Sequence, residues 1–134
     1  MAAIEVAVKN TLEEIMAYVD GFVVPVPEKN LKDYQKMSQK AGKIWRKHGA
    51  VQYIEAVGDD LENKFGASFP KTVKVKSGET VVFSFIAFKS RAHRDKVNAK
   101  VMADPKLNTI ATESSMPFEL KRMLYGGFKV FVDE

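Results

Sequence analysis

Apolar and polar positions divide the chain after residue 16 into alternating segments of strand and helix character. Residues 17–26 (AYVDGFVVPV) are rich in β-branched and aromatic side chains and end at Pro25 and Pro27, which is typical of a strand. Residues 50–57 and 80–88 have the same character. Residues 72–76 are predicted to form a hairpin with residues 80–88 across Ser77-Gly78-Glu79. Gly126 and Gly127 precede a last predicted strand over residues 128–132.

Between these strands, apolar residues recur at helical spacing. One predicted helix runs from an N-cap at Asn30 to a stop at Gly49. Its apolar face contains Leu31, Tyr34, Met37, Ala41, Ile44 and Trp45, and its other side carries a lysine stripe facing water, at Lys29, Lys32, Lys36, Lys40, Lys43 and Lys47.

A second helix is predicted to begin after a cap at Ser90 and to run over residues 91–103, before Pro105. Residues 58–70 and 105–116 are predicted to be irregular. Pro117 is expected at the first helical position of a short turn over residues 118–124.

The resulting order is β-α-β-β-α-β, which predicts an α+β, ferredoxin-like sandwich. Its four-stranded antiparallel sheet would carry both helices on one face. Residues 16–134 are assigned to this single domain. Residues 1–15 fit helical and strand spacing equally well, so they are expected to be an N-terminal appendage.

The third predicted strand is apolar on both faces, which is unusual for a sheet with one side in water. Val81, Phe83, Phe85 and Ala87 point one way, while Val82, Ser84, Ile86 and Phe88 point the other. The first strand behaves similarly, with Tyr18, Phe22 and Val24 opposite Val19, Gly21 and Val23. Helices cover only one of these faces. The pattern therefore predicts a homodimer packed sheet to sheet, although parity alone does not say which face meets the partner.

Composition narrows the class of protein but does not identify a function. The 134 residues include no cysteine, which excludes disulfides, thiolate metal sites and a cysteine nucleophile, and which fits the reducing cytoplasm. No apolar run approaches the roughly 20 residues that cross a bilayer. The sequence shows no secretory leader. We therefore expect a cytoplasmic protein with no membrane partner. The net charge of +4 is compatible with anionic partners without requiring them.

Several long segments resemble the YbaA-like family of uncharacterised bacterial proteins. They are YVDGFVVPVP (18–27), KSRAHRDKVNAKVMADP (89–105), MPF (116–118) and YGGFKVFVD (125–133), and the resemblance covers nearly all of residues 16–133. It implies membership of the dimeric α+β barrel superfamily. That superfamily includes cofactor-free monooxygenases, haem-degrading enzymes, isomerases and ligand binders, so the fold does not imply a function. The family begins near Met16, so residues 1–15 depart from it.

One candidate site lies in the first turn of the second predicted helix. Arg91, His93 and Arg94 follow the Ser90 cap, where free N–H groups favour a carboxylate or phosphate. Positive charge at this end of a helix is electrostatically unfavourable, which is an argument for a function. His93 is a candidate general base. The alternative is a set of solvated residues that flank the cap.

A second candidate site involves carboxylates inside apolar strands. Asp20 shares a face with Tyr18, and Glu55 shares one with Tyr53. A carboxylate on such a strand is costly to bury unless it is paired, so these side chains are expected to line a pocket with a raised pKa for one acid. The alternative is that they form buried ion pairs or lie at a strand edge near water. Arg122 and Tyr125 are expected to close the same cavity. Two distant histidines and no EF-hand spacing argue against a metal site.

An RNA-binding function is the alternative from a different class. Residues 83–88 (FSFIAF) resemble the aromatic half of the RNP1 motif, and residues 18–22 resemble RNP2. However, Val81 and Val82 stand where RNP1 has a basic residue and a glycine. The lysine stripe also lies on the helix side rather than on the sheet, so the sequence argues against nucleic-acid binding.

The sequence thus predicts a homodimer with a small pocket between sheet and helices. The expected ligand is a small anionic or carbonyl-bearing molecule, and any reaction would be cofactor-independent. His93, Asp20 and Tyr18 are the candidate catalytic residues, and Arg91, Arg94, Glu55, Tyr53, Arg122 and Tyr125 the candidate ligand-binding residues. An enzyme and a non-catalytic binder fit equally; they differ in whether pocket variants lose turnover or only affinity.

Overall fold

A computed structural model describes residues 2–4, 17–113 and 116–134. The predicted appendage, residues 1–15, lies mostly outside these residues. The strands are β1 (Tyr18–Pro27), β2 (Gln52–Val57), β3 (Glu79–Phe88) and β4 (Leu124–Lys129). The helices are α2 (Leu31–Lys47), the short α3 (Phe69–Thr72), α4 (Arg91–Met102) and α5 (Pro105–Glu113). Single 3₁₀ turns lie at Glu28–Asn30 and Leu120–Arg122.

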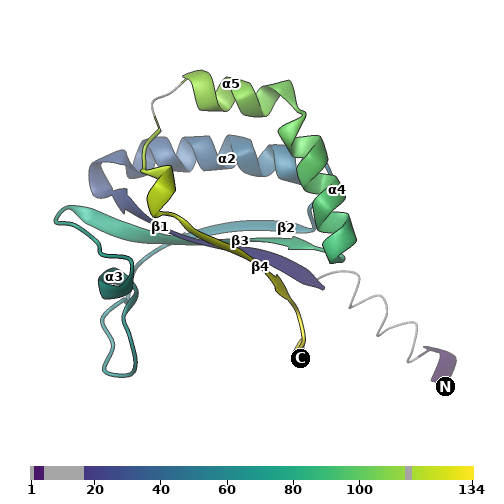
Figure 1. Ribbon diagram of the computed structural model, residues 1–134, viewed down its shortest axis with the longest axis horizontal. Coiled ribbons are helices and arrows are strands. Elements are labelled where there is room, and N and C mark those ends of the chain that lie inside the picture. Colours follow the sequence, from purple (N-terminus) through teal and green to yellow (C-terminus); the bar gives the residue numbers. More distant parts are fainter. Residues whose placement is uncertain (1, 5–16, 114–115) are drawn as a thin grey trace.

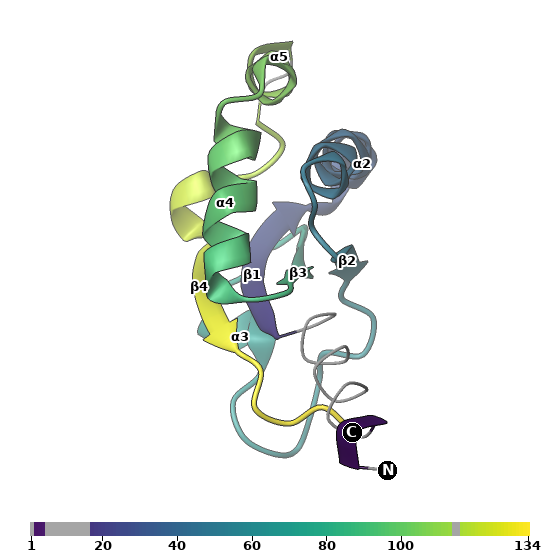
Figure 2. The ribbon, with the colours of Figure 1, turned by 90° about the vertical axis from the view of Figure 1, so that its right-hand side faces the viewer.

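The four strands form one antiparallel sheet in the order β2-β3-β1-β4, which confirms the predicted ferredoxin-like architecture. The register places Asp20 opposite Ile86 and Gly127, and Glu55 opposite Ser84. Helices α2, α4 and α5 lie on one side of the sheet, and α3 lies on the other side near one end (Figure 1). Viewed from the end, the helices form a separate layer over the sheet (Figure 2).

Helix α2 has the predicted amphipathic character. Tyr34 and Ile44 are buried, and the six residues of the lysine stripe are exposed. Gly49 follows the helix with a φ of 114°, which a glycine adopts without strain. Asn30 occupies the predicted N-cap position, but its side chain makes no capping hydrogen bond; its Nδ2 donates instead to the Pro117 carbonyl over 3.0 Å.

The Ser90 cap of α4 is confirmed, since its hydroxyl accepts from the backbone N–H of His93 at 3.0 Å. By contrast, the irregular segment predicted at 105–116 contains helix α5. Helix α4 ends before Pro105 as predicted, but Pro105 then begins α5, and the Asp104 carboxylate accepts from the Lys106 N–H at 2.9 Å.

Two strand predictions also need correction. Residues 72–76 form no strand, because the chain makes the short helix α3 and then a turn before β3 begins at Glu79. The last strand begins earlier than predicted, at Leu124, and contains Gly126 and Gly127 instead of following them. The predicted turn over residues 118–124 is reduced to the 3₁₀ turn Leu120–Arg122.

The strand register shows which face of the sheet meets the helices, a point that the alternation of residues in the sequence did not decide. Val24, Val82, Ile86 and Phe88 face the helices and are buried. The opposite face is apolar and partly open; it presents Val19, Val23, Ile54, Phe83, Phe85, Leu124 and Phe128. We call these seven residues the open face. In the part of the chain that the structure describes, no helix is long and apolar enough to cross a membrane.

Candidate functional site

A cavity of about 560 Å³ lies between the sheet and the helix layer. Its walls are mainly apolar, with contributions from all four strands, α2, α4, α5 and the segment before β4. The polar groups are few and come from Asp20, Tyr34, Ser38, Tyr53, Glu55, Ser84, Asn98 and Tyr125. An apolar cavity with a small set of polar groups is the usual form of a small-molecule site.

Asp20 is the most deeply buried carboxyl group of this cavity, with 1% of its surface exposed. Arg94, on α4, places its Nε 3.3 Å from the Asp20 Oδ1. The same guanidinium donates to the Tyr18 hydroxyl at 2.8 Å and lies over the Tyr18 ring, 4.9 Å from its centroid. Gly127 leaves space for this arrangement, because a Cβ there would lie 2.5 Å from the Arg94 Nη2. Arg94 thus contacts Asp20 directly, and Tyr18 holds the Arg94 guanidinium in place.

Burial and the neighbouring polar groups act on the pKa of Asp20 in opposite directions. Burial raises the pKa of Asp20 above its ordinary value of 3.8, against the opposing charge of Arg94 and hydrogen bonds from Asn98 and Tyr125. The Asn98 Oδ1 is itself fixed by the Trp45 indole N–H at 3.0 Å. Burial and the Asp20 charge also raise the pKa of Tyr125, whose ring stacks on Phe22 with centroids 4.9 Å apart. Tyr125 therefore keeps its proton beside the carboxyl.

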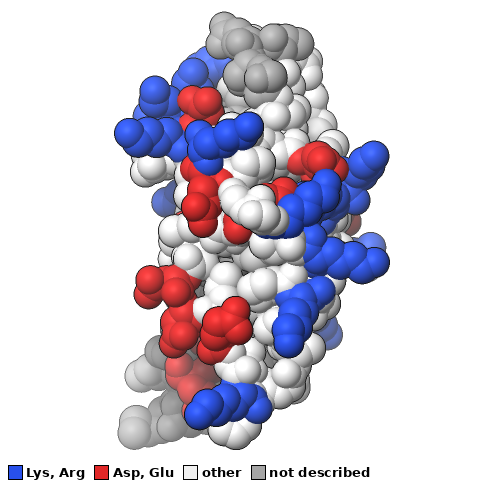
Figure 3. Space-filling model, turned by 90° about the vertical axis from the view of Figure 1, so that its left-hand side faces the viewer, with Lys and Arg blue, Asp and Glu red and all other residues white. Residues whose placement is uncertain are grey.

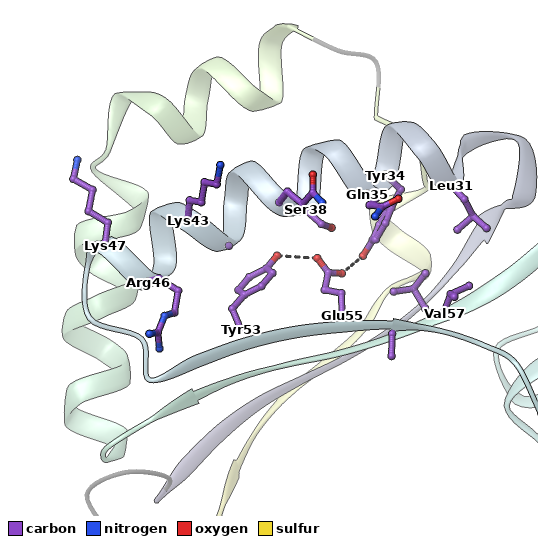
Figure 4. A pocket seen from close by; sticks show the side chains of 14 residues that line it. Leu31, Tyr34, Gln35, Ser38, Lys43, Arg46, Lys47, Tyr53, Glu55 and Val57 are labelled. Carbon is purple, nitrogen blue, oxygen red and sulfur yellow. Dashed lines mark hydrogen bonds between the residues drawn. The ribbon is translucent and has the colours of Figure 1, made fainter.

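A second polar cluster is centred on Glu55. Its two carboxyl oxygens accept hydrogen bonds from the hydroxyls of Tyr34 on α2 and Tyr53 on β2, the latter over 2.9 Å (Figure 4). Ser38 completes the cluster from α2; it is buried, and its hydroxyl has no hydrogen-bond partner among the described residues. Gly42 lets the Tyr53 ring approach α2, since a Cβ there would lie 2.8 Å from the ring.

The Glu55 cluster separates the cavity from an outer groove of about 760 Å³ between α2 and the edge strand β2. Tyr34, Ser38, Tyr53 and Glu55 line both spaces. Basic residues of α2 line the groove, but Lys43 and Lys47 extend away from Glu55 (Figure 4).

The remaining groove base, Arg46, is held at the C-terminal end of α2. Its Nη1 donates to the carbonyl of Ala50 at 3.1 Å and to that of Val51. The positive charge of the groove is therefore directed outward or toward backbone oxygens rather than toward the Glu55 cluster.

The structure brings together only part of the predicted site. Asp20, Tyr53, Glu55 and Tyr125 line the cavity, and Tyr18 and Arg94 stand behind Asp20. Arg122 does not line this cavity; it forms a bidentate pair with Glu79 at 2.7 and 3.0 Å. Its predicted role in closing the cavity is therefore wrong.

The basic cluster at the start of α4 is divided in the same way. Arg94 points inward and contacts Asp20 and Asp95, while Arg91 is exposed. The His93 Nδ1 accepts from the Lys89 N–H at 3.0 Å, and the His93 ring lies edge-on to Phe88 rather than in the cavity. Burial, with nearby lysines, lowers the pKa of His93. These contacts hold the candidate base His93 apart from Asp20. The Arg94 guanidinium is paired with carboxylates of the protein itself, so its position does not require a bound anion.

Four polar residues of the cavity were not anticipated from the sequence: Tyr34, Ser38, Ser84 and Asn98. Tyr34 was placed on the apolar face of its helix, and only the contact with Glu55, 21 residues away, shows a polar role. Ser84 had one signal, as the single polar residue among the helix-facing positions 82, 84, 86 and 88 of β3.

The cavity is acidic and aromatic. Its described lining residues include Asp20 and Glu55 but no lysine, arginine or histidine, so this space does not favour an anionic ligand. Within residues 2–4, 17–113 and 116–134, no group of three histidine, aspartate or glutamate side chains is placed to hold a metal ion.

Comparison with known proteins agrees with this fold. The family model of DUF1428, described as a protein of unknown function, matches residues 17–120. The uncharacterized protein YbaA of Escherichia coli strain K12 is 40% identical over 119 residues, which cover 89% of this chain and 100% of YbaA. The YbaA protein of Shigella flexneri matches equally well.

Two solved structures share the fold at low sequence identity. One is a nipsnap family protein with unknown function from Agrobacterium tumefaciens, with a TM-score of 0.53 and 15% identity over 86% of this chain and 88% of the other. The other, from Arabidopsis thaliana, has a TM-score of 0.53 and 12% identity over 87% and 98% of the chains. The family match and the YbaA relatives confirm the resemblance found in the sequence, and this chain belongs to the DUF1428 family.

Proposed function

We propose that this protein binds a small carbonyl-bearing organic molecule in the cavity between sheet and helices, with Asp20 as the acid–base group. The observation that carries the proposal is a nearly fully buried carboxyl group, with a raised pKa, in the wall of an apolar cavity. Perturbed carboxyl groups in cavities are typical of acid–base sites. The acidic lining favours a neutral carbonyl compound over the anionic ligand that the sequence left open.

The chemistry that fits this geometry is proton transfer next to a carbonyl group. The Asp20 carboxylate would remove a proton from the carbon beside the carbonyl, and the electron pair of that C–H bond would form an enolate. Once Asp20 has taken the proton, the Tyr125 hydroxyl would turn from the Asp20 carboxyl group and hydrogen-bond to the enolate oxygen. Asp20 would then return the proton to carbon, so that no cofactor or oxidant is required. The raised pKa makes Asp20 a stronger base than an ordinary aspartate.

Acetophenone is a suitable probe, because it is small, apolar and carries exchangeable protons beside its carbonyl. Binding would be measured by calorimetry, and exchange of the methyl protons in deuterated buffer by NMR. We expect binding and exchange faster than in buffer for the wild type, and loss of exchange in Asp20→Asn. Asp33→Asn is the matched control, because Asp33 is exposed in the first turn of α2 and lies outside the cavity lining. Thermal unfolding would establish that each variant folds.

The outcomes distinguish an enzyme from a binder. Binding without exchange would refute catalysis and leave a binding protein. Binding that is unchanged in a folded Asp20→Asn, or no binding at all, would contradict the proposed site.

We also propose that a second copy of this chain covers the open face. Its seven side chains are all apolar, and all four strands contribute to them. Phe83 and Phe128 remain 46% and 61% exposed. A contiguous apolar face of this kind is unusual on a monomer, and a twofold dimer buries it with its own copy.

The charge distribution supports a protein partner rather than RNA for this face. Phosphate recognition needs lysine or arginine, and the seven open-face residues include neither. The side of the molecule in Figure 3 carries acidic side chains among basic ones, instead of one basic surface.

A further inference from the structure

The hydrogen bonds of the Glu55 cluster leave it rich in acceptors and poor in donors. Tyr34 and Tyr53 both donate to Glu55, so neither phenolic proton is available to a ligand. Burial, followed by the Glu55 charge, raises the pKa of both tyrosines, which therefore remain protonated. An ionised carboxylate has about four acceptor positions, of which these bonds use two. The free positions on Glu55 and on the phenolic oxygens can only accept.

Ser38 adds a hydroxyl that has no partner of its own. It is 8% exposed, lines both the cavity and the groove, and forms no hydrogen bond of good geometry with the described residues, although its hydroxyl lies near the Tyr34 and Tyr53 hydroxyls and lowers their pKa. A buried hydroxyl without a partner is unfavourable, so this atom is a candidate for ligand contact. Because a hydroxyl rotates freely, it can serve as one more acceptor.

Glu55 also differs from Asp20 in its charge environment. Asp20 faces the Arg94 guanidinium, whereas no salt bridge joins Glu55 to a cation among the described residues. The nearby α2 bases are directed elsewhere, since Lys47 pairs with Asp104 at 3.8 Å and Arg46 binds backbone carbonyls. Hydroxyl donors stabilise a buried carboxylate, but they do not neutralise its charge.

Aromatic rings surround the same cluster. Trp45 packs against Tyr53 with ring centroids 6.0 Å apart, and Phe118 meets Tyr34 edge-on at 5.5 Å. All four residues line the cavity. Aromatic faces attract cations, and the attraction grows where water is excluded.

We propose that the Glu55 cluster binds the ammonium group of a small hydrophobic primary amine. A primary ammonium has three N–H donors and no acceptor, which complements a cluster that offers acceptors and one uncompensated negative charge. The apolar part of the ligand would occupy the cavity toward α4 and α5. This inference rests on the proposed function, because it uses the same cavity. It makes the ligand an amine at the Glu55 end and leaves the Asp20 end for a carbonyl.

A set of probes of equal size tests the charge preference. 2-Phenylethylamine, 2-phenylethanol and phenylacetate differ only in the terminal group, and calorimetry would measure the affinity of each at neutral pH. We expect the amine to bind at least about tenfold more tightly than the alcohol, because a charge-assisted hydrogen bond exceeds a neutral one. Phenylacetate should bind most weakly, since Glu55 repels it.

Variants link the preference to the cluster. Glu55→Gln keeps the size of the side chain and a carbonyl acceptor but removes the charge, so it should abolish the preference for the amine. Glu62→Gln, on the exposed segment after β2, is the matched control and should retain it. Ser38→Ala removes a hydroxyl that forms no well-aligned intramolecular hydrogen bond, so the protein should fold normally and bind the amine several-fold more weakly. This variant tests the inference even if Glu55→Gln does not fold.

The two proposals fail in different ways. If acetophenone binds in an Asp20-dependent manner but the amine binds no better than the alcohol, only the amine inference is overturned. If the amine binds through Glu55 but acetophenone does not depend on Asp20, only the proposed carbonyl site is overturned. An amine preference that is unchanged in Glu55→Gln would also refute the inference.

Discussion

Substitution of Phe83 by lysine should separate the proposed dimer, whereas the same change at Ile86 should damage the core. The two residues are three positions apart on β3 and point to opposite faces of the sheet. Phe83 belongs to the open face, and Ile86 is 4% exposed in the wall of the cavity. Phe83→Lys is therefore expected to give a folded monomer, and Ile86→Lys an unstable or aggregated protein.

The expected magnitude follows from the exposed fraction of Phe83. A phenylalanine side chain buries about 150–250 Å², so the 46% that remains exposed corresponds to roughly 70–115 Å². At about 25 cal/mol per Å², covering this area stabilises the dimer by roughly 2–3 kcal/mol per copy. A twofold interface loses the contribution of both copies, roughly 4–6 kcal/mol, which corresponds to a dissociation constant about 10³- to 10⁴-fold higher.

Analytical ultracentrifugation at micromolar concentration would measure the association, and circular dichroism would establish the fold of each variant. Ala99→Lys is the control, because it adds the same charge at an exposed position of α4, on the helix side. A wild type that sediments as a monomer would refute the dimer. So would a folded Phe83→Lys variant that associates as tightly as the wild type.

Three further outcomes follow from the structure. Gly42→Ala should destabilise the protein by about 1–3 kcal/mol in chemical denaturation, because its Cβ would press on the Tyr53 ring; an unchanged midpoint would show that the ring moves freely. Deletion of residues 1–15 should cost less than about 2 kcal/mol, a size typical of core defects, and a larger loss would show that the segment packs on the domain. The His48 hydrogen bond lowers the pKa of Asp104 below 3.8, so the stability that this carboxylate contributes is present above that pH and is lost as the pH falls below it. Asp104→Asn should therefore weaken the loss of stability at acid pH, and an unchanged loss would exclude this contribution.

The sequence predicted the sheet well because its alternation is local and strong. A strand that is apolar on both faces needs a layer packed against each face. One face of β3 packs under the helices, and the other belongs to the open face. The missed helix α5 shows the limit of local signals. Helix α4 ends at Met102, as a proline at 105 leads one to expect, but Pro105 also begins α5, where the Asp104 carboxylate accepts from the Lys106 N–H.

The glycines before the C-terminus show a second limit. Gly126 and Gly127 resemble a turn in the sequence, but they lie inside β4, where Gly127 leaves space for Arg94. Such a requirement comes from a side chain on a distant helix, so sequence spacing does not reveal it.

The candidate site was only partly predictable for the same reason. Alternation put Asp20 on one face with Tyr18 and Glu55 on one face with Tyr53, because a carboxylate in an apolar strand stands out locally, but the register was needed to show that these faces meet the helices. The partners that determine their chemistry, Arg94 for Asp20 and Tyr34 for Glu55, come from other elements. The charged cluster at the start of α4 drew attention to His93, although this histidine faces away from the cavity.

A crystal structure of the protein soaked with acetophenone would test the central claim most directly. The account predicts that the molecule occupies the cavity between sheet and helices, with its carbonyl end beside the Asp20 carboxyl and Tyr125. Acetophenone bound only on the open face, or a cavity closed by its own side chains, would contradict the claim that this space is the functional site.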